Sequence, residues 1–227
     1  MSKMEKAPWY LKEQNVAKYE DYYQHKYRRA DLLEKRILKT SLEQFAGAET
    51  ILEVGCGTGH FTRWMESLGL ECQGLDVSIL MLEQAKKLWI GGRLLQGESG
   101  HLPFGAKSFD IVTYITSLEY MHNVALVLSE AGRVAKKGII FGLMNKWSTQ
   151  TMRRIFQAKL QCNSHYTEAR FYSIRDIRRL LCENFCNYSI VYWNTTVFPR
   201  FLGNTQSAIL PFGSFLCLAV KLVENDE

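Results

Sequence analysis

The sequence lacks any long hydrophobic run, although 47% of its 227 residues are apolar. No run reaches the roughly 20 residues that a membrane-spanning helix needs. The first twenty residues, MSKMEKAPWYLKEQNVAKYE, also lack the apolar core of a secretory signal peptide. We therefore expect no membrane span and a cytoplasmic location.

Paired cysteine motifs are absent as well, because none of the six cysteines forms a CxxC pair. No His or Cys lies at zinc-site spacing from Cys182 and Cys186. A cytosolic chain normally keeps such thiols reduced and mostly buried, so we expect no metal site. The cysteines are Cys56, Cys72, Cys162, Cys182, Cys186 and Cys217.

The chain has no strong excess of charge: charged residues make up 22% and the net charge is +5. Basic residues cluster at KYRR (26–29), MRR (152–154) and IRDIRRLL (174–181), but no cluster belongs to a recognisable nucleic-acid module. We interpret these clusters as solvated helix faces, with binding of an anionic substrate or RNA as the alternative. The length suits one α/β domain with a sizeable core.

Strand and helix patterns alternate through the middle of the chain. Residues 13–45 carry an apolar stripe at helical spacing and predict a helix in two pieces. Strands are expected at 50–54, 70–76, 92–97, 109–116 and 138–145. They are separated by helices at 58–68, 78–87 and 124–134, the second of which Ser78 can cap. This order predicts a parallel sheet with helices on both faces.

The last third has a different pattern. Residues 147–161 predict an inserted helix, and residues 172–185 predict a helix capped by Ser173. Two further strands, at 188–198 and 213–223, are joined without a helix. They predict a closing antiparallel hairpin.

The stretch ILEVGCGTGHFTRWM (51–65) passes from strand to helix through Gly55, Gly57 and Gly59. Glycines let a ligand lie against the backbone, and the following helix points free N–H groups at it. The spacing is GxGxG, whereas dinucleotide sites carry GxGxxG. Glu53 precedes the loop, and a carboxylate repels a pyrophosphate but attracts an ammonium group. The loop therefore favours a ligand with a positive amino group.

Two further acidic positions follow the next strands. Asp76 ends the second strand about 20 residues beyond the glycines, where an acid accepts hydrogen bonds from ribose hydroxyls. Glu98 and Ser99 follow the third strand and can meet an adenine amino group and ring nitrogen. Amino acid, ribose and adenine are together the parts of S-adenosylmethionine.

At these residues the sequence resembles the class I S-adenosylmethionine-dependent methyltransferases, especially the branch with ubiquinone- and menaquinone-type enzymes. The matching pieces are ILEVGCGTGHFT, GLDVSILMLEQAK, LPFGAKSFDIV and LSEAGRVAKKGIIFGLMN, in the family's order between Ile51 and Asn145. The resemblance implies a Rossmann-like, doubly wound seven-stranded sheet with an antiparallel last strand.

The resemblance also implies roles for single residues, with S-adenosylmethionine as the cofactor and S-adenosylhomocysteine as the product. Many relatives have Asp where this chain has Glu98. Cys56 and Gly57 are expected among the cofactor-binding residues as parts of the glycine loop, with Cys56 as a small filler rather than a nucleophile. The resemblance implies that the methionine moiety is surrounded by Glu53, Gly55, Gly59 and Thr116. It implies that Asp76 holds the ribose and that Val77 and Met81 pack around the adenosine. The adenine edge is expected to meet Glu98 and Ser99.

The reaction expected from this cofactor is an in-line displacement, for which the protein positions the nucleophile and excludes water. A general base is needed only if the acceptor loses a proton. Glu119, Tyr120 and His122 are candidates. Relatives often have histidine near here, where this chain has Glu-Tyr instead, and we therefore assign no catalytic residue.

The acceptor is not specified by any motif. The residues after the fourth strand are TSLE (116–119) rather than an NPPY-like tetrapeptide, which argues against methylation of amino groups on nucleic-acid bases. A small organic acceptor is the first choice and a protein or RNA acceptor the second, while a non-catalytic binding protein is an alternative from another class. We expect a monomer or homodimer.

The chain is expected to form one domain: a helical lid (1–48), a cofactor-binding core (49–145), an inserted cap (146–172), and a helix with a hairpin (173–227). Tyr19, Tyr22, Tyr23 and Tyr27 share roughly one helix face. We expect this face and residues 147–172 to close over the cofactor and form the acceptor pocket. The alternative is that the tyrosines only pack the helix onto the sheet.

Overall fold

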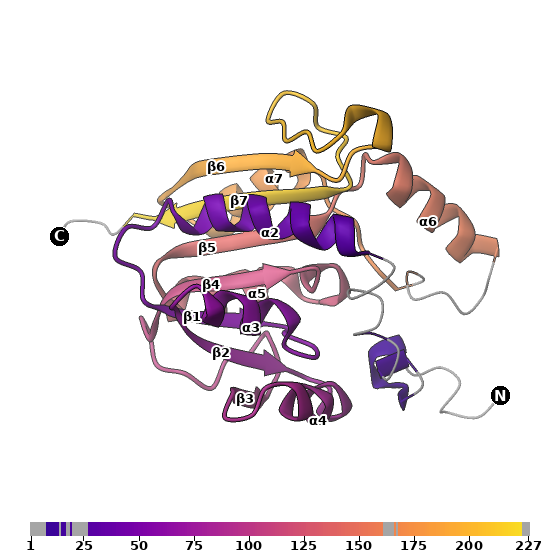
Figure 1. Cartoon of the computed structure of the whole chain (residues 1–227). Helices are drawn as coiled ribbons and strands as arrows, with labels where there is room; N and C mark the ends of the chain where they lie inside the picture. The colour runs from indigo at the N-terminus through magenta and orange to yellow at the C-terminus, as the bar shows by residue number, and fades with distance from the viewer. Residues whose placement is uncertain are drawn as a thin grey trace.

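A seven-stranded sheet forms the centre of the computed structural model, which describes residues 8–13, 15–16, 19, 27–160, 166 and 168–223 (Figure 1). The strand order is β3-β2-β1-β4-β5-β7-β6. Strands β1 to β5 are parallel, and β7 is antiparallel to both neighbours. The expected fold and closing hairpin are confirmed. The strands are β1 (Thr50–Val54), β2 (Glu71–Asp76), β3 (Arg93–Gln96), β4 (Phe109–Ile115), β5 (Ala135–Met144), β6 (Tyr188–Thr196) and β7 (Phe215–Leu222).

Helices cover both faces of the sheet, with α2 and α3 on one face and α5 and α7 on the other (Figure 1). Two helices begin at the serines expected from the sequence. Ser78 accepts a hydrogen bond from the Met81 N–H, and Ser173 forms a capping box with Asp176. The α-helices are α2 (Arg28–Leu42), α3 (His60–Ser67), α4 (Ile79–Leu88), α5 (Val124–Val134), α6 (Thr149–Leu160) and α7 (Ile174–Asn184); η2 (Trp9–Leu11), η4 (Leu118–Tyr120) and η5 (Arg200–Leu202) are 3-10 helices.

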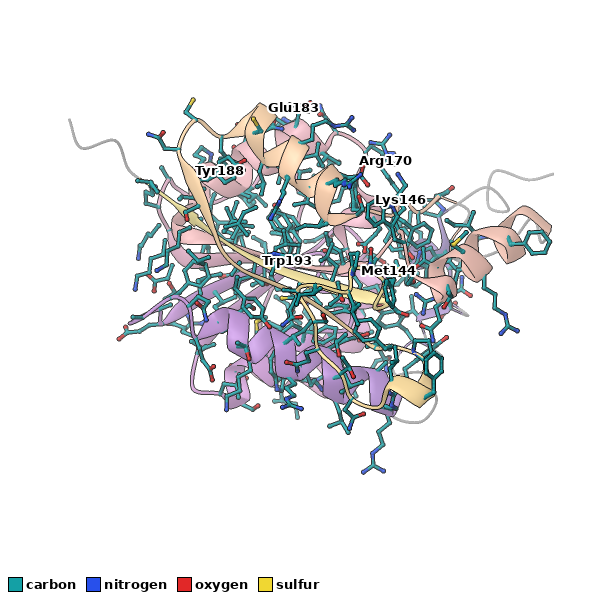
Figure 2. The ribbon with its side chains drawn as sticks, turned by 90° about the horizontal axis from the view of Figure 1, so that it is seen from above. Met144, Lys146, Arg170, Glu183, Tyr188 and Trp193 are labelled. Atoms are coloured by element: carbon teal, nitrogen blue, oxygen red, sulfur yellow. The ribbon has the colours of Figure 1, made fainter. Side chains whose placement is uncertain are left out.

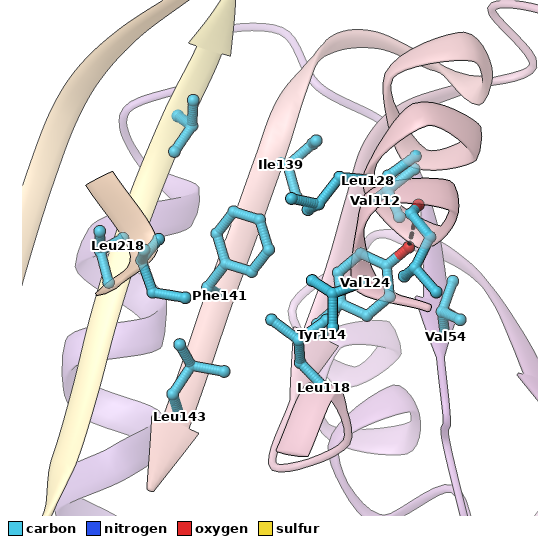
Figure 3. Packing of buried hydrophobic residues seen from close by; sticks show 14 of the residues in the cluster. Val54, Val112, Tyr114, Leu118, Val124, Leu128, Ile139, Phe141, Leu143 and Leu218 are labelled. Atoms are coloured by element: carbon cyan, nitrogen blue, oxygen red, sulfur yellow. Dashed lines mark hydrogen bonds between the residues drawn. The ribbon is translucent and has the colours of Figure 1, made fainter. Parts of the chain in front are cut away.

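Alternate residues of the central strands enter two separate cores. In β4, Val112 and Tyr114 face α5 and α7, whereas Ile111 and Ile115 face α2 and α3. Figure 3 shows the first core, where the Tyr114 hydroxyl donates to the Val127 carbonyl at 3.3 Å. The Tyr114 ring also stacks on a β5 ring, Phe141, at 5.8 Å. The buried hydroxyl is thereby satisfied inside an apolar core.

Glycines in β5 allow close packing on the α2 face. A Cβ on Gly138 would lie 2.1 Å from the Val220 carbonyl oxygen and 2.6 Å from the Phe45 ring. A Cβ on Gly142 would lie 2.7 Å from the Phe215 ring and 3.3 Å from Leu38 of α2. The missing side chains therefore make room for α2 and for the pairing with β7.

The carboxyl ends of the parallel strands meet at one edge of the sheet. Helix α6 leaves this edge after β5 and projects away from the body of the fold (Figure 1). In the described ranges, no helix is both long and apolar enough to cross a bilayer. The second piece of the helix expected at 13–45 is α2, whereas Tyr22 and Tyr23 lie outside the described residues.

Candidate active site

A cavity of about 370 Å³ opens at the carboxyl edge of the sheet, beside the ends of β1, β2 and β4. Its walls come from the glycine loop, from the loops after β2, β3 and β4, and from the N-terminal segment. The lining residues are Trp9, Tyr10, Tyr19, Val54, Gly55, Gly57, Leu75, Asp76, Val77, Met81, Gly97, Glu98, Ser99, Gly100, His101, Thr116, Ser117, Tyr120, Met121, His122, Asn123, Leu126 and Val127.

The glycine loop needs its glycines for two different reasons. Gly55, Gly57 and Gly59 all have positive φ, at 77°, 55° and 74°, which favours glycine. A Cβ on Gly55 would lie 2.5 Å from the Ser117 Cβ, so this glycine lets the loops after β1 and β4 touch. A Cβ on Gly57 would point into open cavity, with its nearest neighbours, Tyr19 and Met81, 3.9 and 4.0 Å away. The backbone at Gly57 is thus left accessible to a ligand.

Asp76 ties the glycine loop to the end of β2. Its Oδ2 accepts from the Gly57 N–H and its Oδ1 from the Ser78 N–H, both at 2.8 Å. The side chain is buried, and desolvation raises its pKa although the backbone N–H groups lower it. Asp76 lines the cavity, so one buried carboxylate both shapes the loop and presents oxygen atoms to a ligand.

Three of the expected cofactor residues do not line the cavity. Glu53 is buried beneath the loop, and its carboxylate accepts a hydrogen bond from the Thr62 hydroxyl of α3. Cys56 is buried against β2, 2.7 Å from where a Cβ on Gly74 would stand, and burial raises the pKa of its thiol well above the usual value. Gly59 caps the start of α3. Here Cys56 has the packing of a filler.

The other expected residues lie on the cavity wall. Val77 and Met81 follow β2, and Glu98 and Ser99 follow β3. Thr116 follows β4 with a φ of +49°, a conformation that a threonine adopts only when its surroundings hold it there. Its N–H donates to the Gly142 carbonyl of β5 at 2.7 Å.

Aromatic side chains of the N-terminal segment cover the cavity, and two of them were not expected from any pattern in the sequence. Trp9 stacks on Tyr19 at 5.6 Å and meets the edge of Tyr120 at 5.6 Å. The Tyr10 carbonyl accepts from the Ser78 hydroxyl at 2.7 Å. Trp9 and Tyr10 precede the core by 40 residues, so no local motif links them to it. No described residue of 147–172 lines this cavity.

Of the candidate bases, Tyr120 and His122 line the cavity and Glu119 does not. Glu119 is buried, and its Oε1 accepts from the Met144 N–H at 2.5 Å. Burial raises the pKa of Glu119 to about 7, although the Met144 N–H lowers it. Its backbone carbonyl accepts from the Arg170 N–H at 2.7 Å. Glu119 therefore ties the loop after β4 to β5 and to the segment after α6.

Glu53 gives a testable pH dependence. Burial raises its pKa from 4.5 to about 8, against the opposing effect of the Thr62 hydrogen bond. Since folding favours the protonated form, the contribution to stability is fully present below the unfolded pKa and is lost as the pH rises towards 8. Between pH 5 and 8 the free energy of unfolding should fall by about 3 kcal/mol more in the wild-type protein than in Glu53→Gln. Urea titrations measure this difference, with the exposed Glu83→Gln as control; parallel pH curves for wild type and Glu53→Gln would contradict it.

Comparison with protein families identifies the core. Residues 52–142 match the family model described as "Methyltransferase domain". These residues form a class I S-adenosylmethionine-dependent methyltransferase domain. The matched range runs from β1 to β5 and includes the glycine loop, Asp76, Glu98 and Thr116.

The methyltransferase domain is similar to named proteins that it matches over part of their length. A malonyl-[acyl-carrier protein] O-methyltransferase of Buchnera aphidicola is 31% identical over 148 residues, which are 64% of this chain and 58% of that protein. A demethylmenaquinone methyltransferase of Thermotoga maritima is 34% identical over 105 residues, or 45% of each chain. The chain spans about three fifths or less of the length of these relatives.

Solved structures share the fold of this protein over nearly the whole chain. An S-adenosylmethionine-dependent methyltransferase from Thermotoga maritima, called a possible histamine N-methyltransferase, has a TM-score of 0.76 and 24% identity and covers 94% of this chain and 98% of its own. The magnesium protoporphyrin IX methyltransferase of Synechocystis, solved with bound S-adenosylhomocysteine, has a TM-score of 0.60 and 15% identity and covers 89% and 97%.

The cavity of the methyltransferase domain fits the family's cofactor, S-adenosylmethionine. The open backbone at Gly57 leaves room that a Cβ would fill, and the buried carboxylate of Asp76 stands beside it. Glu98 and Ser99 supply further polar groups to the lining, and apolar side chains such as Leu75 also line the cavity. A ligand with an amino acid, a ribose and an adenine needs this distribution of polar and apolar surface.

Proposed function

We propose that this protein transfers a methyl group from S-adenosylmethionine to a small organic acceptor bound in the same cavity. The observation that carries the proposal is the meeting of the glycine loop, Asp76 and an aromatic cover around one cavity of about 370 Å³. The bound cofactor would supply an electrophilic methyl group. The chain would hold the cofactor, orient the acceptor and exclude water.

The cofactor residues have distinct proposed tasks. Asp76 would accept ribose hydroxyls, Glu98 and Ser99 would meet the adenine edge, and Thr116 would stand beside the methionine part. Glu53 lies beneath the glycine loop with a raised pKa. We propose that it acts on an ammonium group through its field rather than by direct contact, since a nearby positive charge favours its ionised form.

A small acceptor is supported by the relatives and by the cavity. The relatives are named for a malonyl group on its carrier protein and for demethylmenaquinone. Tyr120 and His122 would face the acceptor and offer hydrogen-bonding groups. The five cysteines that the structure describes are all free, which supports a reducing, cytoplasmic setting.

We propose that the N-terminal segment acts as the lid. Trp9, Tyr10 and Tyr19 line the cavity, and the Tyr10 carbonyl is bonded to Ser78 at the end of β2. Aromatic rings with polar tips suit a cover that is apolar inside and wet outside. The proposed closure would keep water from the methyl group.

Calorimetric titration should show tight binding of S-adenosylmethionine and S-adenosylhomocysteine and weak or no binding of NAD. Incubation of a metabolite extract with the protein and methyl-labelled cofactor should then yield S-adenosylhomocysteine and a labelled product. Trp9→Ala should weaken binding of S-adenosylhomocysteine, because it removes part of the cover. Tighter binding of NAD would overturn the cofactor assignment, whereas cofactor binding without turnover on any acceptor would indicate a non-catalytic binding protein.

A further inference from the structure

Two segments at the carboxyl edge of the sheet expose large apolar side chains. The first is residues 146–160, which contain α6, and the second is residues 197–214, which connect β6 to β7. We call them together the edge surface. Its exposed apolar residues, with exposed fractions from 39% to 88%, are Trp147, Met152, Phe156, Phe201, Ile209 and Phe212. Such a group is unusual on the surface of a protein surrounded only by water.

The two segments share a common base. Asn145, at the end of β5, donates from Nδ2 to the Pro211 carbonyl at 2.6 Å and to the Gly213 carbonyl at 2.7 Å. Helix α6 starts just beyond and extends outward, with Lys146 at its base (Figure 2). The Arg175 guanidinium lies over the Trp147 ring, 5.2 Å from its centre. The edge surface is therefore anchored to the sheet and carries cations beside its apolar residues.

The charged residues in the sequence of these two segments all have one sign. The segments contain five basic residues and no Asp or Glu, whereas the whole chain has a net charge of only +5. The remaining residues are thus balanced between acids and bases. The basic residues in the sequence of these segments are Lys146, Arg153, Arg154, Lys159 and Arg200. In the structure Arg153 is exposed, the Lys146 ammonium lies 3.5 Å from a carboxylate oxygen of Asp176, and the Arg154 guanidinium lies over the Tyr166 ring, 5.1 Å from its centre.

We propose that the edge surface docks on a membrane that contains anionic lipids. Helices that lie in a membrane interface combine Trp, Phe and other apolar side chains, which enter the acyl boundary, with Lys and Arg, which stay among the headgroups. Met152 and Phe156 stand one turn apart on α6 and are both 63% exposed, so they form one apolar stripe. Arg153 is exposed beside them.

Other occupants fit this surface less well. In a symmetric dimer built on this patch, the same excess of positive charge would face itself. A protein partner usually packs its anchors into preformed pockets. Neither of the two cavities described in this protein is lined by any of the six apolar residues. Exposed apolar side chains of this kind can enter a lipid bilayer, because lipids rearrange around each of them.

The test is co-sedimentation of the protein with phosphatidylcholine vesicles that do or do not contain phosphatidylglycerol, at low and high salt. The wild-type protein should bind the anionic vesicles, and added salt should weaken the binding. The double variant Arg153→Gln/Phe156→Ser should bind at least about fivefold more weakly, the loss expected from one basic residue alone. Loss of Phe156 should add to this effect.

A matched control removes the same chemistry elsewhere. Lys86→Gln/Ile90→Ser takes one exposed cation and one apolar side chain, 93% exposed, from α4 and the turn after it. This control should bind vesicles like the wild-type protein. Both variants should bind S-adenosylhomocysteine normally, since none of the four positions lines the cavity.

Several results would overturn the proposal. These are recovery of the wild-type protein only in the supernatant, and a loss of vesicle binding in the control as large as that in the double variant. Binding to soluble polyglutamate but not to vesicles would indicate an acidic protein partner instead. Self-association at high salt that Phe156→Ser abolishes, without vesicle binding, would indicate a second copy of the chain.

Discussion

The Asp76→Ala variant is expected to bind S-adenosylhomocysteine about a hundredfold more weakly than the wild-type protein, a loss of about 3 kcal/mol, because hydrogen bonds to a charged group are worth about 1.5–3 kcal/mol each. The same substitution also leaves the Gly57 and Ser78 N–H groups without their acceptor. The glycine loop should therefore loosen while the sheet stays folded. Calorimetric titration measures the affinity, and circular dichroism checks the fold.

Asp110→Ala is the matched control for Asp76→Ala. Asp110 is equally buried, at 8% exposed, and its carboxylate also accepts from two backbone N–H groups, those of Glu49 and Thr50, at 2.9 and 3.1 Å. It stands at the start of β4, away from the cavity. Asp110→Ala should lower stability but leave the affinity unchanged. If Asp76→Ala were folded and bound the ligand as tightly as the wild type, Asp76 would not be the ribose ligand.

The Gly138→Ala variant is expected to lose about 3 kcal/mol or more of unfolding free energy, at or beyond the upper end for an added methyl group in a packed core. Glycine is a poor strand residue, so an alanine in a strand would ordinarily raise stability. Here the new Cβ would stand 2.1 Å from the Val220 carbonyl oxygen, which belongs to the paired backbone of β7 and cannot swing aside. The change should separate β5 from β7.

Gly105→Ala is the control for Gly138→Ala. A Cβ on Gly105 would lie 3.5 Å from the Ser108 hydroxyl, an ordinary contact, and its φ is not in the left-handed region. Urea titration should place Gly105→Ala close to the wild-type protein. Equal stability of the two alanine variants would mean that β5 and β7 can separate locally at little cost.

The residues that line the cavity from the N-terminal segment could be foreseen only in part. Tyr19 was expected to face the ligand, and it lines the cavity. Trp9 and Tyr10 were not foreseen, because their link to the core is the contact of Trp9 with Tyr120 and the bond from Ser78 to the Tyr10 carbonyl. Both contacts join residues far apart in the chain, so no local sequence pattern indicates them. The role of residues 147–172 in an acceptor pocket stays a prediction.

The sequence alone determined the features that depend on neighbours along the chain. The alternation of strands and helices, the GxGxG turn, and the caps at Ser78 and Ser173 follow from periodicity, backbone freedom and hydrogen bonds over a few residues. The acids at the ends of β2 and β3 could be located for the same reason, since Asp76 is the last residue of β2 and Glu98 lies two residues beyond β3.

Only the tertiary structure decided which of these residues share a surface. It set Glu53 beneath the glycine loop beside Thr62, and it made Gly55 a contact point for Ser117 as well as part of a ligand loop. It also brought α6 and the β6–β7 connection together through Asn145. These arrangements depend on packing between segments far apart in the chain, where volume and hydrogen-bond partners are matched in space, and no local pattern of residues records that match.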